Sequence, residues 1–183
     1  NSGSSANLLA VSALIEKHGK RKYIITSATG FATTVAPIYQ NNLVPIYVDS
    51  NPHTLLPSEE QIAQALAHYG NDVNGIIISH PLGFLFDERK IAGMLQEEQF
   101  LISDCCDALG PQLKYPDAPP VHPGYYSHVS TFSFFPAHHI TTAEGGAVAT
   151  DDVDLYDLIL SFANWGRDCH CAPGQNNVCG KRF

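Results

Sequence analysis

Hydrophobic positions along the chain form short continuous runs that alternate with longer helical patterns. Runs such as 23–27, 75–80 and 100–104 contain few polar residues, which is typical of parallel strands buried on both faces. Between the runs, apolar residues recur at helical spacing and are bounded by capping serines or aspartates and by glycines. We expect strands at 23–27, 44–50, 75–80, 100–104, 129–135 and 146–151, and helices at 2–18, 33–40, 58–70, 87–98 and 153–163.

This alternation predicts an α/β fold with a mostly parallel sheet and helices on both of its faces. Residues 111–128 are rich in Pro and Tyr and predict a loop, and residues 166–183 form a cysteine-rich tail without helical period. The 183 residues, 44% of them hydrophobic, are enough for one core. The chain begins with Asn1 rather than Met, so we expect it to be part of a longer protein.

Charge and cysteine content narrow the function classes. The net charge of −8 argues against a nucleic-acid or anionic-membrane partner, and no apolar run reaches the ~18 residues of a membrane span. The five cysteines include an adjacent pair and a Cys-x-Cys, and an odd number fits a disulfide framework poorly. Metal or redox chemistry in a reducing compartment fits better, so we expect a cytoplasmic protein.

Two features could bind a cofactor. The small hydroxylated residues at 1–7 open a helix, whose free N–H groups would suit a phosphate, although they could equally be a plain helix cap. Asp104 follows a predicted parallel strand at its carboxyl end, where ligand sites of open sheets collect. It could hold the protonated ring nitrogen of a pyridoxal-type cofactor or be a solvated loop aspartate.

Two further features could carry chemistry. His138 and His139 stand between a Phe-rich strand and Glu144-Gly145-Gly146, and could be catalytic or simply structural. The tail contains three thiols, Cys169, Cys171 and Cys179. They could bind zinc or an iron–sulfur cluster, with a fourth ligand from Cys105 or Cys106, or could remain unligated.

Five motifs occur together in a known order: SGSSANLL, SHPLGFLFD, SDCCDALG, SFFPAHHITTAEGG and WGRDCHCAPGQNNVCGKRF. With them the chain resembles, over essentially all its length, the sugar-nucleotide aminotransferase/dehydratase family (DegT/DnrJ/EryC type) of the aspartate-aminotransferase fold. It is most similar to the branch that removes the C3 hydroxyl of CDP-4-keto-6-deoxyglucose in lipopolysaccharide O-antigen synthesis. The resemblance implies the central part of a fold type I large domain, inactive without its small C-terminal domain and homodimer partner.

The resemblance also implies roles for individual residues. In the family's aminotransferases the motif is Ser-Phe-x-x-x-Lys, and its lysine carries the cofactor as a Schiff base; counting from Ser133 places His138 there. Imidazole has no primary amine but can transfer protons, which implies free pyridoxamine 5′-phosphate (PMP) with His138 as the base. His139 then needs no role. The implied contacts to the cofactor are Gly3, Ser4, Ser5 and Ser133 at the phosphate, and Phe31, Asp104 and Asp107 at the ring.

The cysteine spacing separates branches of the family. The branch with an iron–sulfur cluster has a C-x-C-x7-C tail and uses the second residue of its Cys-Cys pair. This implies a [2Fe–2S] cluster held by Cys106, Cys169, Cys171 and Cys179. A flavin/iron–sulfur reductase would then supply electrons for deoxygenation of the nucleotide sugar.

Two alternatives remain open at this point. One is a cluster-free, PMP-dependent dehydratase or aminotransferase, and the other is a zinc-binding domain without enzymatic activity. The chain also departs from the family pattern, because Ser103 stands where Glu is common and residues 112–128 are longer and richer in Pro than usual.

Overall fold

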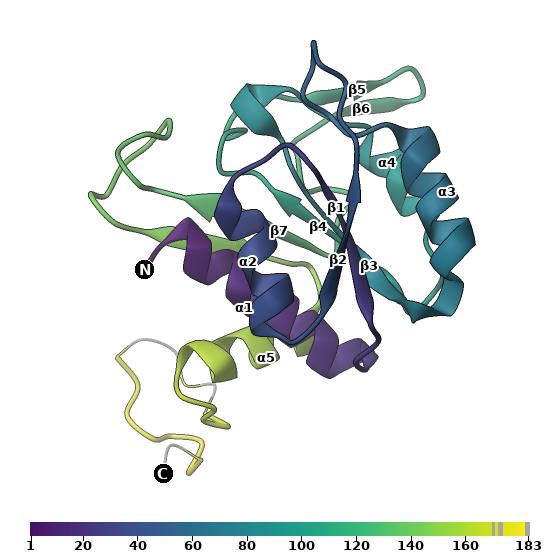
Figure 1. The fold of residues 1–183 in the computed structure, drawn as a ribbon. Helices are drawn as coiled ribbons and strands as arrows, with labels where there is room; N and C mark the ends of the chain where they lie inside the picture. The colour runs from purple at the N-terminus through teal and green to yellow at the C-terminus, as the bar shows by residue number, and fades with distance from the viewer. Residues whose placement is uncertain (170, 172–173, 182–183) are drawn as a thin grey trace.

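The computed structural model describes residues 1–169, 171 and 174–181 as a twisted six-stranded sheet between two layers of helices (Figure 1). The strand order is β2-β1-β3-β4-β7-β8. The first five are parallel and β8 is antiparallel to β7, which confirms the predicted mostly parallel sheet. The strands are β1 (Tyr23–Ser27), β2 (Val44–Val48), β3 (Val73–Ser79), β4 (Phe100–Asp104), β7 (Val129–Ser133) and β8 (Gly146–Ala149).

Helices pack on both faces, as the sequence predicts. One face carries α1 (Gly3–His18), α2 (Ala32–Gln40) and α5 (Val153–Ala163), and the other carries α3 (Glu59–Tyr69) and α4 (Glu88–Ala92). Short 3₁₀ turns follow α3 at Gly70–Asp72 and β3 at Pro81–Gly83. Among the described helices, none combines the length and apolar character needed to cross a bilayer.

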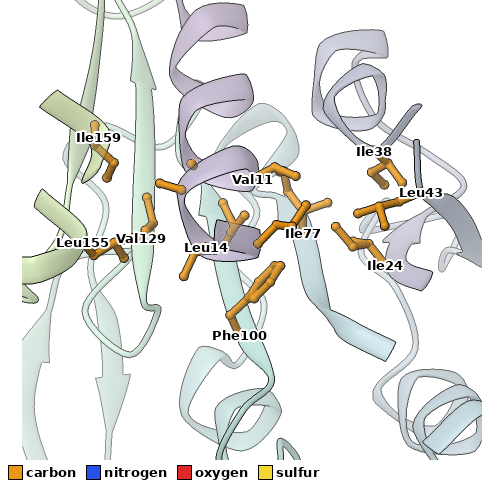
Figure 2. Packing of buried hydrophobic residues seen from close by; sticks show 14 residues of the cluster. Val11, Leu14, Ile24, Ile38, Leu43, Ile77, Phe100, Val129, Leu155 and Ile159 are labelled. Atoms are coloured by element: carbon orange, nitrogen blue, oxygen red, sulfur yellow. The ribbon is translucent and has the colours of Figure 1, made fainter. Parts of the chain in front are cut away.

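Both faces of the central strands are buried, which explains their continuous apolar runs. Along β3, Ile77 packs toward α1 (Figure 2), whereas Ile76 and Ile78 pack toward α3 and α4. Gly75 lies where the β4 backbone comes closest, since a Cβ atom there would be 2.3 Å from the carbonyl oxygen of Phe100. The alternation of strand faces thus divides the core into two apolar clusters, one on each side of the sheet.

Two predicted elements differ from the structure. The helix expected at 87–98 ends at Gly93, after which Met94 and Leu95 make only i→i−3 hydrogen bonds. Glycine has a low helix propensity, and the tighter turn returns the chain to β4. The expected loop 111–128 contains a small hairpin, β5 (Leu113–Tyr115) and β6 (Ala118–Val121). Proline is rare in strands, so the prolines of this segment predicted a loop instead.

Asp152 joins the last described helix to the first. Its carboxylate caps α5 by accepting a hydrogen bond from the Leu155 N–H at 3.0 Å, and it pairs with Lys17 of α1. The hydrogen bond from Lys17, followed by the one from the Leu155 N–H, lowers the pKa of Asp152. A lowered pKa means that the interaction stabilises the fold above the unfolded-state pKa and fades as the pH falls through the folded-state pKa.

We expect Asp152→Ala to lower the free energy of unfolding by about 0.5–1 kcal/mol at neutral pH, because α5 loses its cap and its ion pair. The difference from wild type should shrink at acid pH, where Asp152 becomes protonated. Urea titrations at neutral pH and at successively lower pH measure both effects. Asp152→Asn, which keeps a capping oxygen, should lose less, and a pH-independent difference between wild type and the alanine variant would contradict the assignment.

Candidate active site

A cavity of about 750 Å³ opens at the carboxyl ends of β3, β4 and β7, beside the first turn of α1. This is where an open parallel sheet places its ligand site. The structure brings most of the predicted site residues into its walls: Gly3, Ser4, Phe31, Asp104, Cys106, Asp107, Ser133 and His138. Ser5 is not part of the lining; its N–H donates to the Ser2 side chain within the helix cap. No lysine is found among the described residues of this lining.

The first turn of α1 forms one wall. Its N–H groups lack intrahelical acceptors, so Gly3 and Ser4 present donors and the positive end of the helix dipole to the cavity. Only glycine permits this arrangement, because a Cβ at position 3 would be 2.6 Å from Ser133 Cβ and 3.0 Å from Cys106 Sγ. This corner of the cavity therefore suits an anionic group such as a phosphate.

The Asp104 carboxylate is buried and fixed by three donors. Its Oδ2 accepts from Asn7 Nδ2 at 2.9 Å and from Thr34 Oγ1 at 2.7 Å, while Oδ1 accepts from the Cys106 N–H at 3.2 Å. Asn7 is held in turn by Thr131, whose hydroxyl donates to Asn7 Oδ1 at 2.6 Å. The carboxylate is thereby presented at the cavity wall in a single orientation, as recognition of a protonated ring nitrogen requires.

Pro37 in α2 contributes to this arrangement. Proline has no N–H, so the Thr33 carbonyl one turn earlier loses its helical donor and instead accepts from Asn7 Nδ2 at 3.2 Å. Sequence reasoning missed Asn7, Thr34 and Thr131 as supports of Asp104. Two features of the sequence could have indicated them: Asn7 is a polar residue on the buried face of an apolar helix, and Pro37 lies inside a helix.

His138 and Asp107 form a hydrogen-bonded pair at the wall. His138 Nδ1 lies 3.0 Å from Asp107 Oδ1, and Asp107 Oδ2 accepts from the Leu82 N–H at 3.3 Å. Leu82 adopts φ 54°, a left-handed conformation that costs roughly 1 kcal/mol for a non-glycine residue and aims this N–H at Asp107. An ionised carboxylate can only accept, so Nδ1 carries the proton and Nε2 is left as a base. His139 is exposed and outside the cavity lining.

The adjacent cysteines occupy different environments. Cys106 lies on the cavity wall, whereas Cys105 is fully buried. Burial, followed by the negative charge of Asp104, raises the pKa of the Cys106 thiol, and burial likewise raises that of Cys105. Both thiols are therefore protonated near neutral pH, and a metal cation would be needed to stabilise either thiolate.

The three tail thiols come together beyond α5. Cys179 Sγ lies 3.3 Å from Cys171 Sγ and 3.4 Å from Cys169 Sγ, a grouping that suits a thiophilic metal ion or cluster. Cys106, the fourth ligand expected from the sequence, is not part of this group. The structure therefore assembles three of the four expected ligands.

Comparisons with known proteins show the family of the chain. The model of the DegT/DnrJ/EryC1/StrS aminotransferase family matches residues 1–181. The chain is 43% identical to the lipopolysaccharide biosynthesis protein RfbH of Salmonella typhimurium, covering 100% of this chain and 41% of that protein. It is 42% identical to dTDP-4-dehydro-2,6-dideoxy-D-glucose 3-dehydratase of Saccharopolyspora spinosa, covering 100% and 39%.

A solved structure supports the same likeness. GDP-4-keto-6-deoxymannose-3-dehydratase with a trapped PLP-glutamate geminal diamine superposes with a TM-score of 0.78 at 29% identity, covering 90% of this chain and 42% of the other. The fold is thus that of the pyridoxal phosphate-dependent aminotransferases. The chain spans about two fifths of the length of these three relatives.

We expect Asn7→Ala to destabilise the protein by about 1–3 kcal/mol, because Thr131 loses the acceptor of its buried hydroxyl and Asp104 loses one of its three donors. Asn164→Ala is the matched control: Asn164 is exposed and its amide only caps α5, so its loss should cost about 0.5 kcal/mol or less. Urea unfolding midpoints of the two variants measure the difference. Equal, small shifts would show that Asn7 does not secure Asp104.

Proposed function

Because the chain belongs to the DegT/DnrJ/EryC1/StrS aminotransferase family, we propose that it is the cofactor-binding part of a PMP-dependent sugar-nucleotide 3-dehydratase. One observation favours a dehydratase over an aminotransferase. His138, paired with Asp107, stands on the cavity wall at the position where the resemblance places the cofactor-bearing lysine, and no lysine is among the described lining residues. A chain without that amine cannot anchor pyridoxal phosphate there covalently.

The residues present fit PMP. The first turn of α1, at Gly3 and Ser4, together with the Ser133 hydroxyl, would hold its phosphate, whereas Ser5 lies outside the cavity lining. Asp104 would hold the ring nitrogen, and Phe31, largely exposed at the cavity, would cover a ring face. When bound, PMP supplies an electron-withdrawing ring that makes a neighbouring C–H bond acidic.

His138 supplies the proton-transfer chemistry. Its Nε2 can take a proton from a carbon atom of the bound reactants, and the Asp107 carboxylate on Nδ1 then stabilises the resulting imidazolium. The Leu82 N–H restrains Asp107 and hence the imidazole plane. In this proposal Asp107 is a positioning residue for the base, and it lines the same cavity as the residues that would contact the cofactor ring.

The substrate proposal is a nucleotide-linked 4-keto-6-deoxyhexose that loses its C3 hydroxyl during lipopolysaccharide O-antigen synthesis in the cytoplasm. Support comes from relatives named as 3-dehydratases of dTDP-linked and GDP-linked keto sugars and from one named for lipopolysaccharide biosynthesis. CDP as the nucleotide rests on the resemblance of the sequence alone. We also propose that the full-length protein forms a homodimer.

The thiols lead to a further proposal, a [2Fe–2S] cluster held by Cys106, Cys169, Cys171 and Cys179. Its chemistry would be transfer of single electrons from a flavin/iron–sulfur reductase. The close approach of the three tail thiols supports a metal centre. Two alternatives remain: the separate position of Cys106 favours a cluster-free dehydratase, and three grouped thiols would also suit zinc.

We expect His138→Asn in the full-length protein to lower turnover of the keto sugar by about 10²–10⁴-fold, the usual contribution of a general base. Binding of PMP, measured by calorimetry, should change little, because the phosphate and ring-nitrogen contacts remain. His139→Asn is the matched control and should retain activity, since that side chain is exposed outside the cavity lining. Undiminished turnover in the His138 variant would remove the base from the proposal.

The cluster proposal predicts a brown protein after anaerobic purification, with the visible absorption of a [2Fe–2S] centre. Replacing any one of its four cysteines by Ser should bleach it, because each iron needs its full set of ligands. Cys105→Ser should keep the colour, since that thiol is buried away from the cavity wall. A colourless protein containing zinc would select the zinc alternative, and one without bound metal would select the cluster-free dehydratase.

A further inference from the structure

A second buried carboxylate, Glu88, lies outside the cavity lining and has no role in the chemistry described above. It is the first residue of α4, and its side chain is 0% exposed. Burying a carboxylate is costly unless its oxygens receive hydrogen bonds. The groups around Glu88 therefore show what the carboxylate does.

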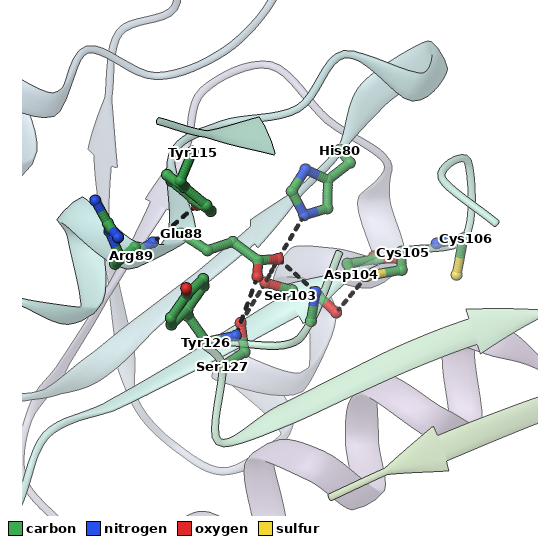
Figure 3. Close-up of polar contacts among 11 residues, drawn as sticks. His80, Glu88, Arg89, Ser103, Asp104, Cys105, Cys106, Tyr115, Tyr126 and Ser127 are labelled. Carbon is green, nitrogen blue, oxygen red and sulfur yellow. Dashed lines mark hydrogen bonds and ion pairs between the residues drawn. The ribbon is translucent and has the colours of Figure 1, made fainter. Parts of the chain in front are cut away.

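Four groups from three separate segments surround this carboxylate, and Figure 3 labels the residues of three of them, His80, Ser103 and Tyr126. Oε1 lies 2.9 Å from His80 Nε2 and accepts hydrogen bonds from Ser103 Oγ at 2.8 Å and from the Gly124 N–H at 2.6 Å. Oε2 accepts from the Tyr126 N–H at 3.4 Å. One side chain thus joins the residue after β3, a residue of β4 and the segment that leads into β7.

Two of these segments adjoin the cavity, and the third packs against Cys105. Ser103 directly precedes Asp104, and the His80 N–H donates to the Asp104 carbonyl at 3.0 Å. His80 itself lies in the cavity lining, and its Nδ1 has no hydrogen-bond partner among the described residues, so Glu88 is the polar tether of its ring. On the third segment, a Cβ at Gly124 would be 3.8 Å from Cys105 Sγ, so this segment helps to bury that thiol.

We infer that Glu88 is a positioning residue of the cavity: it ties these segments together behind the turn 104–107 and so holds Asp104, Cys106 and Asp107 in place. The inference rests on the proposed function only for the identity of the ligand, PMP. In this inference residues 111–128 also support the cavity, because Glu88 binds the end of this long segment behind the turn 104–107.

The pattern of donors requires a carboxylate at this place. Glutamine has the same shape but replaces one acceptor by an NH₂ donor, which would then face the Tyr126 N–H or the donors at Oε1. The segment would still keep a surface anchor, because Arg89 pairs with Asp117 at 2.9 Å and its guanidinium lies over the Tyr115 ring. We therefore expect Glu88→Gln to loosen the cavity while the domain stays folded.

The test uses the full-length protein and two readouts, the Kd for PMP and the alkylation of Cys105 by N-ethylmaleimide, mapped by mass spectrometry. Glu88→Gln should weaken PMP binding about 10-fold or more, as loss of an outer-shell support typically does, and should expose Cys105 to alkylation. Glu59→Gln is the matched control. Glu59 is likewise the first residue of a helix, α3, but its ion pair among the described residues is with Lys90 at the surface, so both readouts should stay at wild-type values.

An exchange variant separates the carboxylate from mere packing. Because Ser103 Oγ lies 2.8 Å from Glu88 Oε1, a glutamate at position 103 can deliver its carboxylate to the same place when residue 88 is serine. Glu88→Ser combined with Ser103→Glu should restore PMP affinity and protection of Cys105, whereas Glu88→Ser alone should not. If Glu88→Gln is insoluble, this pair of variants decides the question.

Three outcomes would contradict the inference. Wild-type PMP affinity and a protected Cys105 in Glu88→Gln would show that Glu88 positions nothing. Failure of the exchange variant to recover either property would show that packing, not the carboxylate, matters. Potential ligand atoms of His80, Glu88 and Cys105 also lie within 4.8 Å of one another. If wild type contains one equivalent of zinc that both Glu88→Gln and Cys105→Ser lose, these residues are metal ligands instead.

If wild type itself fails to bind PMP, the proposed function fails, and alkylation of Cys105 still tests the role of Glu88.

Discussion

The hydrogen bonds around Asp104 are the constraint on which the site depends. A buried carboxylate at the end of β4 is stable only with donors around it, and these come from Asn7 of α1, Thr34 of α2 and the backbone of Cys106. The hydrogen bonds that Asp104 accepts from Asn7 and Thr34 therefore fix the start of α1 and the start of α2 against the sheet. The same contacts hold the first turn of α1, the proposed phosphate site, and Asp104, the proposed partner of the ring nitrogen, in one geometry.

The active turn is supported from both sides. Toward α1, Asp104 is fixed by Asn7 and Thr34; toward α4, Ser103 and His80 are fixed by Glu88. Neighbouring residues of a strand point to opposite faces, so Ser103 and Asp104 connect one short strand end to two separate polar networks. Such a doubly anchored turn is what a preorganised site needs, because its side chains lose little freedom when a ligand binds.

The proposed function depends on a histidine at position 138, where the resemblance places a lysine. His138 lines the same cavity as the proposed cofactor contacts, and Asp107 and the strained Leu82 hold its ring. A base in this place is compatible with proton transfer and incompatible with covalent anchoring of the cofactor. The three grouped thiols of the tail lie beyond α5, whereas Cys106, the fourth ligand of the proposed metal centre, lies on the cavity wall.

The sequence alone was enough for the α/β class, the parallel strands and the motif residues, because continuous apolar runs, helix caps and motif spacing are local properties. It also singled out Asp104 and His138. It missed the shortened α4, the β5–β6 hairpin and the supporting residues Asn7, Thr34 and Glu88. Asn7 and Thr34 bind a carboxylate 97 and 70 positions away, and the partners of Glu88 lie on three separate segments. Only the tertiary structure decided those pairings, because the donors that stabilise a buried carboxylate are chosen by packing and not by sequence neighbours.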